Sequence, residues 1–110
     1  MSLEDWDFEH QRLETEASVA EIRAESGLGK DVRVDLDLEF AAAGDDADAP
    51  AALKALGMFG YAADLVDGRI QVTLPDVAFD AGEIWQHEER TTRIVLARGF
   101  EPDGWGFQEP

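Results

Sequence analysis

The chain has 110 residues, of which 45% are hydrophobic, so its length and composition fit one domain with a single modest core. Its 25 acidic and 9 basic residues give a formal net charge of -16, which disfavours direct binding to nucleic acid or to an anionic membrane. The absence of cysteine excludes disulfides, thiolate catalysis and cysteine-ligated metal centres. The acidity itself has two interpretations: solubility or salt adaptation, and attraction to a basic protein surface.

No stretch of the sequence approaches the roughly 20 apolar residues that are needed to cross a bilayer. The first residues, Met1 to Asp5, are acidic and lack the basic start and apolar centre of a signal peptide. We therefore expect a cytoplasmic protein.

Residues 5–25 are predicted to form a helix, because a mostly apolar set recurs there at spacings of three and four. We expect this set to form the packed face, since acidic residues fill much of the remaining helix surface. The following segment at 26–29, Ser-Gly-Leu-Gly, predicts a helix stop and a flexible joint. The recurring set consists of Trp6, His10, Leu13, Ala17, Ala20 and Ala24.

Residues 32–40 give the clearest local pattern, an alternation of apolar and charged side chains. A period of two places one set on each face of a β-strand. We expect the apolar face to be core and the charged face to meet solvent, as in an antiparallel or mixed sheet. The apolar set is Val32, Val34, Leu36, Leu38 and Phe40, and the charged set is Arg33, Asp35, Asp37 and Glu39.

Residues 41–49 favour a loop, and residues 50–59 favour a helix. Pro50 suits the first turn of this helix, and Asp48 is its candidate N-cap. Gly60 is expected to end the helix with a positive φ. The expected apolar side consists of Leu53, Leu56 and Phe59.

Residues 61–66 and 69–74 predict two strands joined by a tight turn at Asp67-Gly68. Pro75 and Asp76 are expected to end the second of these strands. Its inward-facing residues are predicted to be Ile70, Val72 and Leu74.

Residues 80–98 predict the last helix, with Asp80 as its N-cap and Glu83 completing a capping box. Gly99 is the expected residue of positive φ beyond its end. Trp6 and Trp85 are both expected to pack in or beside the core. One side of the helix carries Ile84, Glu88, Thr91 and Val95, joined by Trp85, Thr92 and Leu96.

The final segment, 100–110, reads FEPDGWGFQEP and predicts a fourth strand rather than a frayed tail. Asp103-Gly104 is expected to bend it, so that Trp105 and Phe107 anchor one side. Glycines on both sides of Trp105 permit close approach of another backbone or of a bulky partner. Because tryptophan is also enriched at binding hot spots, both a structural and a contact role are open, and the structural role is favoured.

The element order predicts the fold, since a first helix is followed by a βαββαβ series. That series matches the ferredoxin-like arrangement, in which two helices cover one face of a four-stranded antiparallel sheet. We expect one α+β domain over 1–110, with 1–29 as an extra N-terminal helix and joint and 30–110 as the core. The open face is expected to carry the charged residues of 32–40 together with Arg69, Gln71 and Thr73.

The sequence offers little catalytic chemistry. His10 and His87 lie in no metal-binding motif, because the stretch from His87 begins like the zinc-peptidase signature but has Thr91 in place of the second histidine. Asp35 and Asp37 share a strand face, but with 25 acidic residues a solvated charged face is the favoured interpretation. No phosphate loop or nucleophile elbow is present in the sequence. We therefore expect no enzyme activity, metal or cofactor.

These features together resemble the regulator of ribonuclease E activity B family, small bacterial protein inhibitors of the endoribonuclease ribonuclease E. The resemblance rests on the quartet Asp103-Gly104-Trp105-Gly106, supported by Gly60-Tyr61 after the middle helix and by the acidic N-terminal helix. It implies a ferredoxin-like domain with an extra N-terminal helix, which acts by binding protein and not by catalysis. The implied target carries arginine-rich RNA-binding regions, toward which an acidic protein would be steered.

Better-known members of that family continue into a long acidic tail, whereas this sequence ends at Pro110. The resemblance therefore predicts the fold more strongly than the target. The leading functional prediction is a non-catalytic regulator of RNA metabolism that binds a basic protein, with ribonuclease E as the implied partner. The candidate contact residues are Asp35, Asp37, Glu39, Asp103, Gly104, Trp105 and Gly106.

Two alternatives stay open. A ligand-binding or enzymatic ferredoxin-like domain, formed where the open sheet faces of a homodimer meet, would show a concave pocket with convergent polar groups. A purely structural homodimer is the second alternative. The charged face of 32–40 disfavours face-to-face pairing unless Arg33 and Arg69 are placed to compensate.

Overall fold

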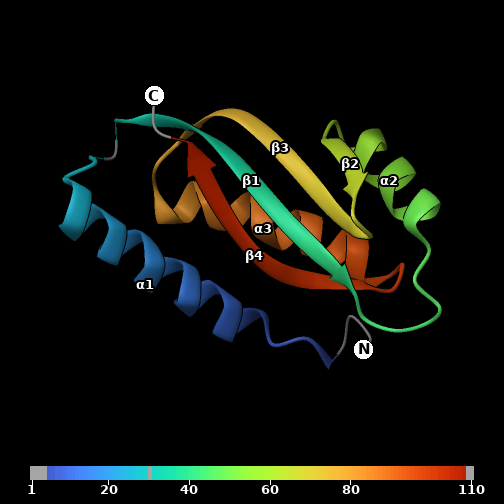
Figure 1. Ribbon diagram of the computed structural model, residues 1–110. Coiled ribbons are helices and arrows are strands. Elements are labelled where there is room, and N and C mark those ends of the chain that lie inside the picture. Colours follow the sequence, from blue (N-terminus) through green and yellow to red (C-terminus); the bar gives the residue numbers. More distant parts are fainter. Residues whose placement is uncertain (1–4, 30, 109–110) are drawn as a thin grey trace.

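The computed structural model describes residues 5–29 and 31–108 as an α+β protein with three helices and a four-stranded antiparallel sheet (Figure 1). The predicted order of elements is confirmed. The parts of the predicted domain at 1–4, 30 and 109–110 lie outside the described residues. The elements are α1 (Phe8–Ser26), β1 (Arg33–Ala42), α2 (Ala49–Met58), β2 (Ala62–Val66), β3 (Arg69–Ala78), α3 (Ala81–Leu96) and β4 (Phe100–Gln108).

The sheet has the strand order β2-β3-β1-β4, so β1 lies inside it and β4 forms one edge. The alternation predicted for 32–40 is confirmed from Arg33 to Phe40, where the apolar set is buried and the charged set faces outward, whereas Val32 precedes the strand and is half-buried and the strand continues to Ala42. Helices α2 and α3 contribute Leu56, Ile84 and Val95 to the core beneath this apolar face. Helix α1 runs along the β4 side of the molecule and packs on α3 (Figure 1). Over the described residues, no helix has the length and apolar character to cross a bilayer.

The packed face predicted for the first helix is wrong. Of that set, Leu13 is 51% exposed and His10 also lies in solvent, whereas α1 buries Gln11, Thr15 and Val19. The physical reason is that Gln11 and Thr15 hydrogen-bond to side chains of α3, so polar groups are buried where periodicity places none. The helix begins at Phe8, later than predicted, because the Asp7 side chain accepts a hydrogen bond from the backbone N–H of His10 at 2.9 Å.

Strand β3 does not end at Pro75 and Asp76, as the sequence predicted. It continues to Ala78 through an irregularity in the pairing with β1. Val34 pairs with Val77 and Leu36 pairs with Leu74, so β3 has one extra residue there. Asp76 takes a φ of 58° there, and its N–H donates to the Asp35 side chain at 3.2 Å. A bulge thus accommodates the proline that would otherwise interrupt the ladder.

Two details of the other helices also differ from prediction. Phe59 is 64% exposed instead of packing with Leu56, because α2 ends at Met58 and Phe59 forms its C-cap. The capping box of α3 is half confirmed. Asp80 accepts from the N–H of Glu83, but the Glu83 carboxylate accepts from the N–H of Ala78 at 2.6 Å.

The predicted Asp67-Gly68 turn is confirmed by positive φ at both residues.

The last strand contains the bend that the sequence predicted, in the form of a bulge. Glu39 and Phe40 are neighbours in β1, whereas their partners Gly104 and Pro102 lie two residues apart in β4. Asp103 is therefore the extra residue, and Gly104 takes a φ of 125° beside it. The extra residue changes which side chains face inward beyond the bulge.

Gly104 and Gly106 offer a matched test of this geometry. Gly104→Ala should destabilise the protein by about 1–3 kcal/mol, because a side chain at this φ is strained even though no atom lies near the added Cβ. Gly106→Ala should change stability by about 0.5 kcal/mol or less, since Gly106 has ordinary φ and equal open space. Urea unfolding of both variants measures the difference, and equal losses would contradict the assigned strain.

Candidate functional site

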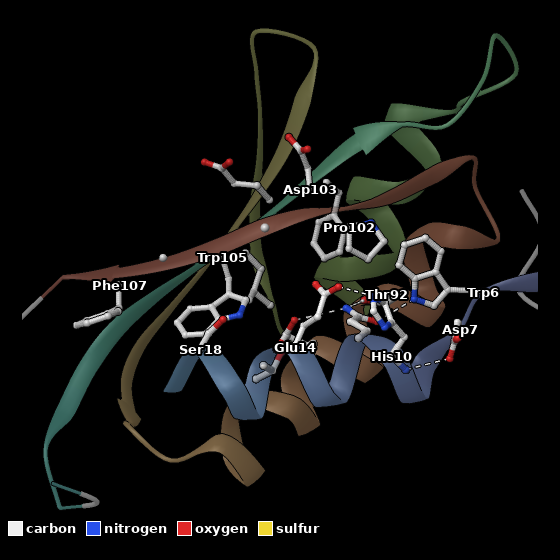
Figure 2. Close-up of a pocket in the computed structure, with 18 of the residues that line it drawn as sticks. Trp6, Asp7, His10, Glu14, Ser18, Thr92, Pro102, Asp103, Trp105 and Phe107 are labelled. Carbon is white, nitrogen blue, oxygen red and sulfur yellow. Dashed lines mark hydrogen bonds and ion pairs between the residues drawn. The ribbon is translucent and has the colours of Figure 1, made fainter. Parts of the chain in front are cut away.

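Helices α1 and α3 and strands β1 and β4 line a cavity of about 1010 Å³ that is partly open to solvent. Its apolar wall includes Trp6, Phe40, Pro102, Trp105 and Phe107. In the view of Figure 2, Trp105 and Phe107 point from β4 toward α1, while Asp103 points the other way. The bulge thus turns both aromatic side chains into the space that α1 borders. We call this space the α1–β4 cavity.

A buried polar network forms part of the cavity wall. The indole Nε1 of Trp6 donates to Gln11 Oε1 at 2.9 Å, and Gln11 Nε2 donates to Thr92 Oγ1 at 3.2 Å and to Glu88 Oε2 at 3.4 Å. The hydroxyl of Thr15 donates to Glu88 Oε1. Across the described residues, every buried side-chain nitrogen or oxygen atom has a hydrogen-bond partner. The network therefore joins α1 to α3 without an orphaned polar group.

Glu88 is the titratable centre of this network, with only 7% of its surface exposed. Burial raises the pKa of Glu88 from its ordinary value of 4.5 to about 7, against the lowering effect of the hydrogen bonds from Thr15 and Gln11. The nearby negative charge of Glu14 on α1 raises the pKa further. The Glu88 carboxyl therefore keeps its proton to a higher pH than an exposed glutamate does.

The electrostatics of the α1–β4 cavity favour a cation. Six of the described residues that line it carry carboxyl groups, of which Asp103 points away from α1, and no described lining residue is lysine or arginine. The histidine among the described lining residues is His10, whose Nε2 lies 2.5 Å from Glu14 Oε1. Arg69, which approaches from the open face of the sheet, is paired with Asp103. The lining carboxyl residues are Asp5, Asp7, Glu14, Glu39, Glu88 and Asp103.

The structure divides the predicted contact residues into two groups. Asp35 and Asp37 do not line the cavity: Asp35 accepts from the N–H of Asp76, and Asp37 accepts from Thr73 Oγ1 at 3.2 Å on the open face of the sheet. The half-buried Trp105 serves both the core and the cavity, so the structural and contact roles are compatible. The predicted residues in the cavity lining are Glu39, Asp103, Gly104, Trp105 and Gly106.

The histidines take no part in a common site. His10 lies on α1, whereas His87 Nδ1 lies 3.2 Å from the Tyr61 hydroxyl, which also accepts from Arg90 at 3.3 Å. Burial, and secondarily the charge of Arg90, lower the pKa of His87. Over residues 5–29 and 31–108, no three His, Asp or Glu side chains form a group that would hold a metal ion.

Sequence reasoning missed the polar network as a unit. The available signal was the position of Glu88 and Thr92 on the same side of α3 as Ile84 and Val95, since an ionisable residue in an apolar stripe needs buried partners. The sequence carried no comparable signal for Gln11. Neither a protein-family model nor a curated protein matches the chain.

Glu88→Gln should remove a pH-dependent part of the stability. Because folding raises the pKa of Glu88, the folded state keeps a proton that the unfolded chain releases, so this contribution is complete below pH 4.5 and lost as pH rises to 7. The wild-type protein should lose about 3 kcal/mol of unfolding free energy in this way as the pH rises. Urea unfolding between pH 4.5 and pH 8 measures it as the wild-type-minus-variant difference. Glu89→Gln, at an exposed neighbour paired with Arg93, is the control, and a Glu88→Gln curve parallel to wild type would contradict the assignment.

Proposed function

We propose that this protein is a non-catalytic, acidic regulator that takes a basic segment of another protein into the α1–β4 cavity. The observation that carries the proposal is the composition of the wall, whose described residues include six with carboxyl groups, one of them the outward-pointing Asp103, and no lysine or arginine. Half-buried aromatic side chains beside these carboxyl groups suit the aliphatic stems and flat guanidinium groups of basic residues. The net charge of -16 would steer a basic partner toward the protein.

We further propose that β1 to β4, with α2 and α3, form a ferredoxin-like unit to which α1 is added. The strand order β2-β3-β1-β4 and the antiparallel pairing support this, because the same order arises when two βαβ units are interleaved. This fold is what the resemblance to the regulator of ribonuclease E activity B family implies. Ribonuclease E, with its arginine-rich regions, is accordingly the proposed partner, and control of RNA decay in the cytoplasm of a bacterium is the proposed role.

A small organic cation is the second candidate ligand. The observation that favours it is the volume of the cavity, about 1010 Å³ and near the upper limit of ordinary ligand pockets, with the buried network of Gln11, Glu88 and Thr92 in its wall. This cavity lies on the helix side of the sheet and within one chain, unlike the pocket expected between open sheet faces. On the open face, Arg33 pairs with Asp76 and Arg69 with Asp103, so each arginine already has a partner within the chain.

A pair of neutralising substitutions on α1 tests the proposed function. Glu14→Gln should weaken binding of an arginine-rich segment of ribonuclease E about threefold to tenfold at low salt, because Glu14 is a cavity residue. Glu21→Gln removes the same charge from an exposed position of α1 outside the cavity and should have at most a small effect. Fluorescence anisotropy of a labelled segment measures both. Equal weakening would show that net charge alone acts, and absence of binding by wild type would refute the proposed function.

Two tryptophans allow stability to be separated from binding. Trp105→Ala should destabilise the protein by about 1–2 kcal/mol, below the 3–5 kcal/mol typical of fully buried aromatic residues, because the side chain is half-buried. Trp85→Ala, at a half-buried position of α3 outside the cavity, should cost a similar amount. Only Trp105→Ala should also weaken binding of the arginine-rich segment, when binding is measured at a temperature at which both variants are folded. Full binding by a folded Trp105→Ala protein would assign this residue a purely structural role.

A further inference from the structure

Strand β4 is an edge strand whose backbone pairs on one side only, with β1. No other described segment forms backbone hydrogen bonds along its outer side. An edge of this kind presents a row of N–H and C=O groups that a further strand can pair with. Many proteins cover or charge such an edge. Here α1 lies on the same side but packs on α3, and the α1–β4 cavity lies between α1 and the strand.

The cavity follows the edge of β4 and not only one face. Six consecutive residues, Pro102 to Phe107, border it. Successive side chains of a strand point to opposite faces, so a cavity on one face would be lined by alternate residues. Gly104 and Gly106 border the cavity although they have no side chain, so the open space reaches the backbone of β4 there.

The dimensions of the cavity suit an extended peptide. On α1 the lining residues run from His10 to Ile22, which is about 18 Å of helix at about 1.5 Å per residue. An extended chain of about five or six residues covers that distance at about 3.3 Å per residue. The stretch of β4 that borders the cavity has a similar length. The bordering parts of α1 and β4 and an extended peptide of this size therefore match in length.

The two glycines of the quartet remove obstacles to close approach. A Cβ built on Gly104 or Gly106 meets no atom within 4 Å, and because these residues pair with Glu39 and Asp37, that open space lies on the outer face of the sheet. Glycine in a strand often marks a place where another backbone approaches closely. Between them, Trp105 supplies an apolar surface on which the side chains of a guest strand can rest.

We propose that the basic segment of the partner binds as an extended strand, pairing its backbone with the free edge of β4 and lying between β4 and α1. This inference rests on the proposed function and specifies how the segment is held. Alternate side chains of the guest strand face the cavity, where the exposed carboxyl group of Glu14 is the acceptor on the α1 wall. As in other complexes formed by strand addition, main-chain pairing supplies affinity and side-chain contacts supply specificity. Here the carboxyl groups select basic side chains.

Two peptides of equal charge test this mode of binding. The first has five Arg-Val repeats, which favour an extended conformation, and the second is the same peptide methylated at every backbone nitrogen, which removes its hydrogen-bond donors. We expect the first to bind the full chain about tenfold or more tighter in calorimetry at low salt. Hydrogen exchange should show new protection of the outward-pointing amides between Asp103 and Phe107, which do not bond to β1, with the first peptide only.

The outcomes separate the mode of binding from the proposed function. Stronger binding of the unmethylated peptide with protection in β4 supports strand addition. Equal binding of both peptides with unchanged exchange in β4 overturns strand addition and leaves an acidic cavity that selects charge. Binding of neither peptide at low salt overturns both. Protection confined to the β2 edge, the other edge of the sheet, also overturns the assignment to β4.

Discussion

The placement of α1 depends on the hydrogen bonds around the buried carboxyl of Glu88. This helix buries Gln11, Thr15 and Val19, so only one of its three buried residues is apolar. A buried carboxylate without partners would cost several kcal/mol, and the bonds from Thr15 and Gln11 offset part of that cost. The remaining cost is expressed as the raised pKa of Glu88. The attachment of α1 is thus polar and specific, where most helices of small domains attach through an apolar stripe.

The cavity follows from this attachment together with the bulge of β4. Because the polar network ties α1 to α3, the helix stands beside the sheet edge and does not close onto it. The extra residue at Asp103 then turns Trp105 and Phe107 toward α1, and Phe107 reaches Phe79 in the core with ring centroids 4.9 Å apart. One wall is therefore anchored by hydrogen bonds and the other by aromatic packing.

Much of the fold could be predicted because its strands obey local rules. The alternation in β1, the Asp67-Gly68 turn and the Asp48 cap each rest on a short stretch of sequence whose backbone preference agrees with its environment. The face of α1 could not be predicted, since Gln11 and Thr15 are buried by partners 73 to 81 residues away. The bulge that carries β3 past Pro75 likewise depends on pairing with β1 and not on the local sequence.

The candidate site could be predicted only on its β4 side. The glycines around Trp105 indicated close approach of a partner, and the structure places open space there. The opposite wall comes from Glu88, whose burial is a tertiary property. Ionisation of Glu88 above pH 7 has two opposite effects. It weakens the attachment of α1, and it also adds negative charge to the cavity. A cation in the cavity would favour the ionised form of Glu88 by Coulomb attraction and so offset the lost stability of the α1 attachment. An ionised Glu88 and a docked α1 are therefore compatible when the cavity is occupied.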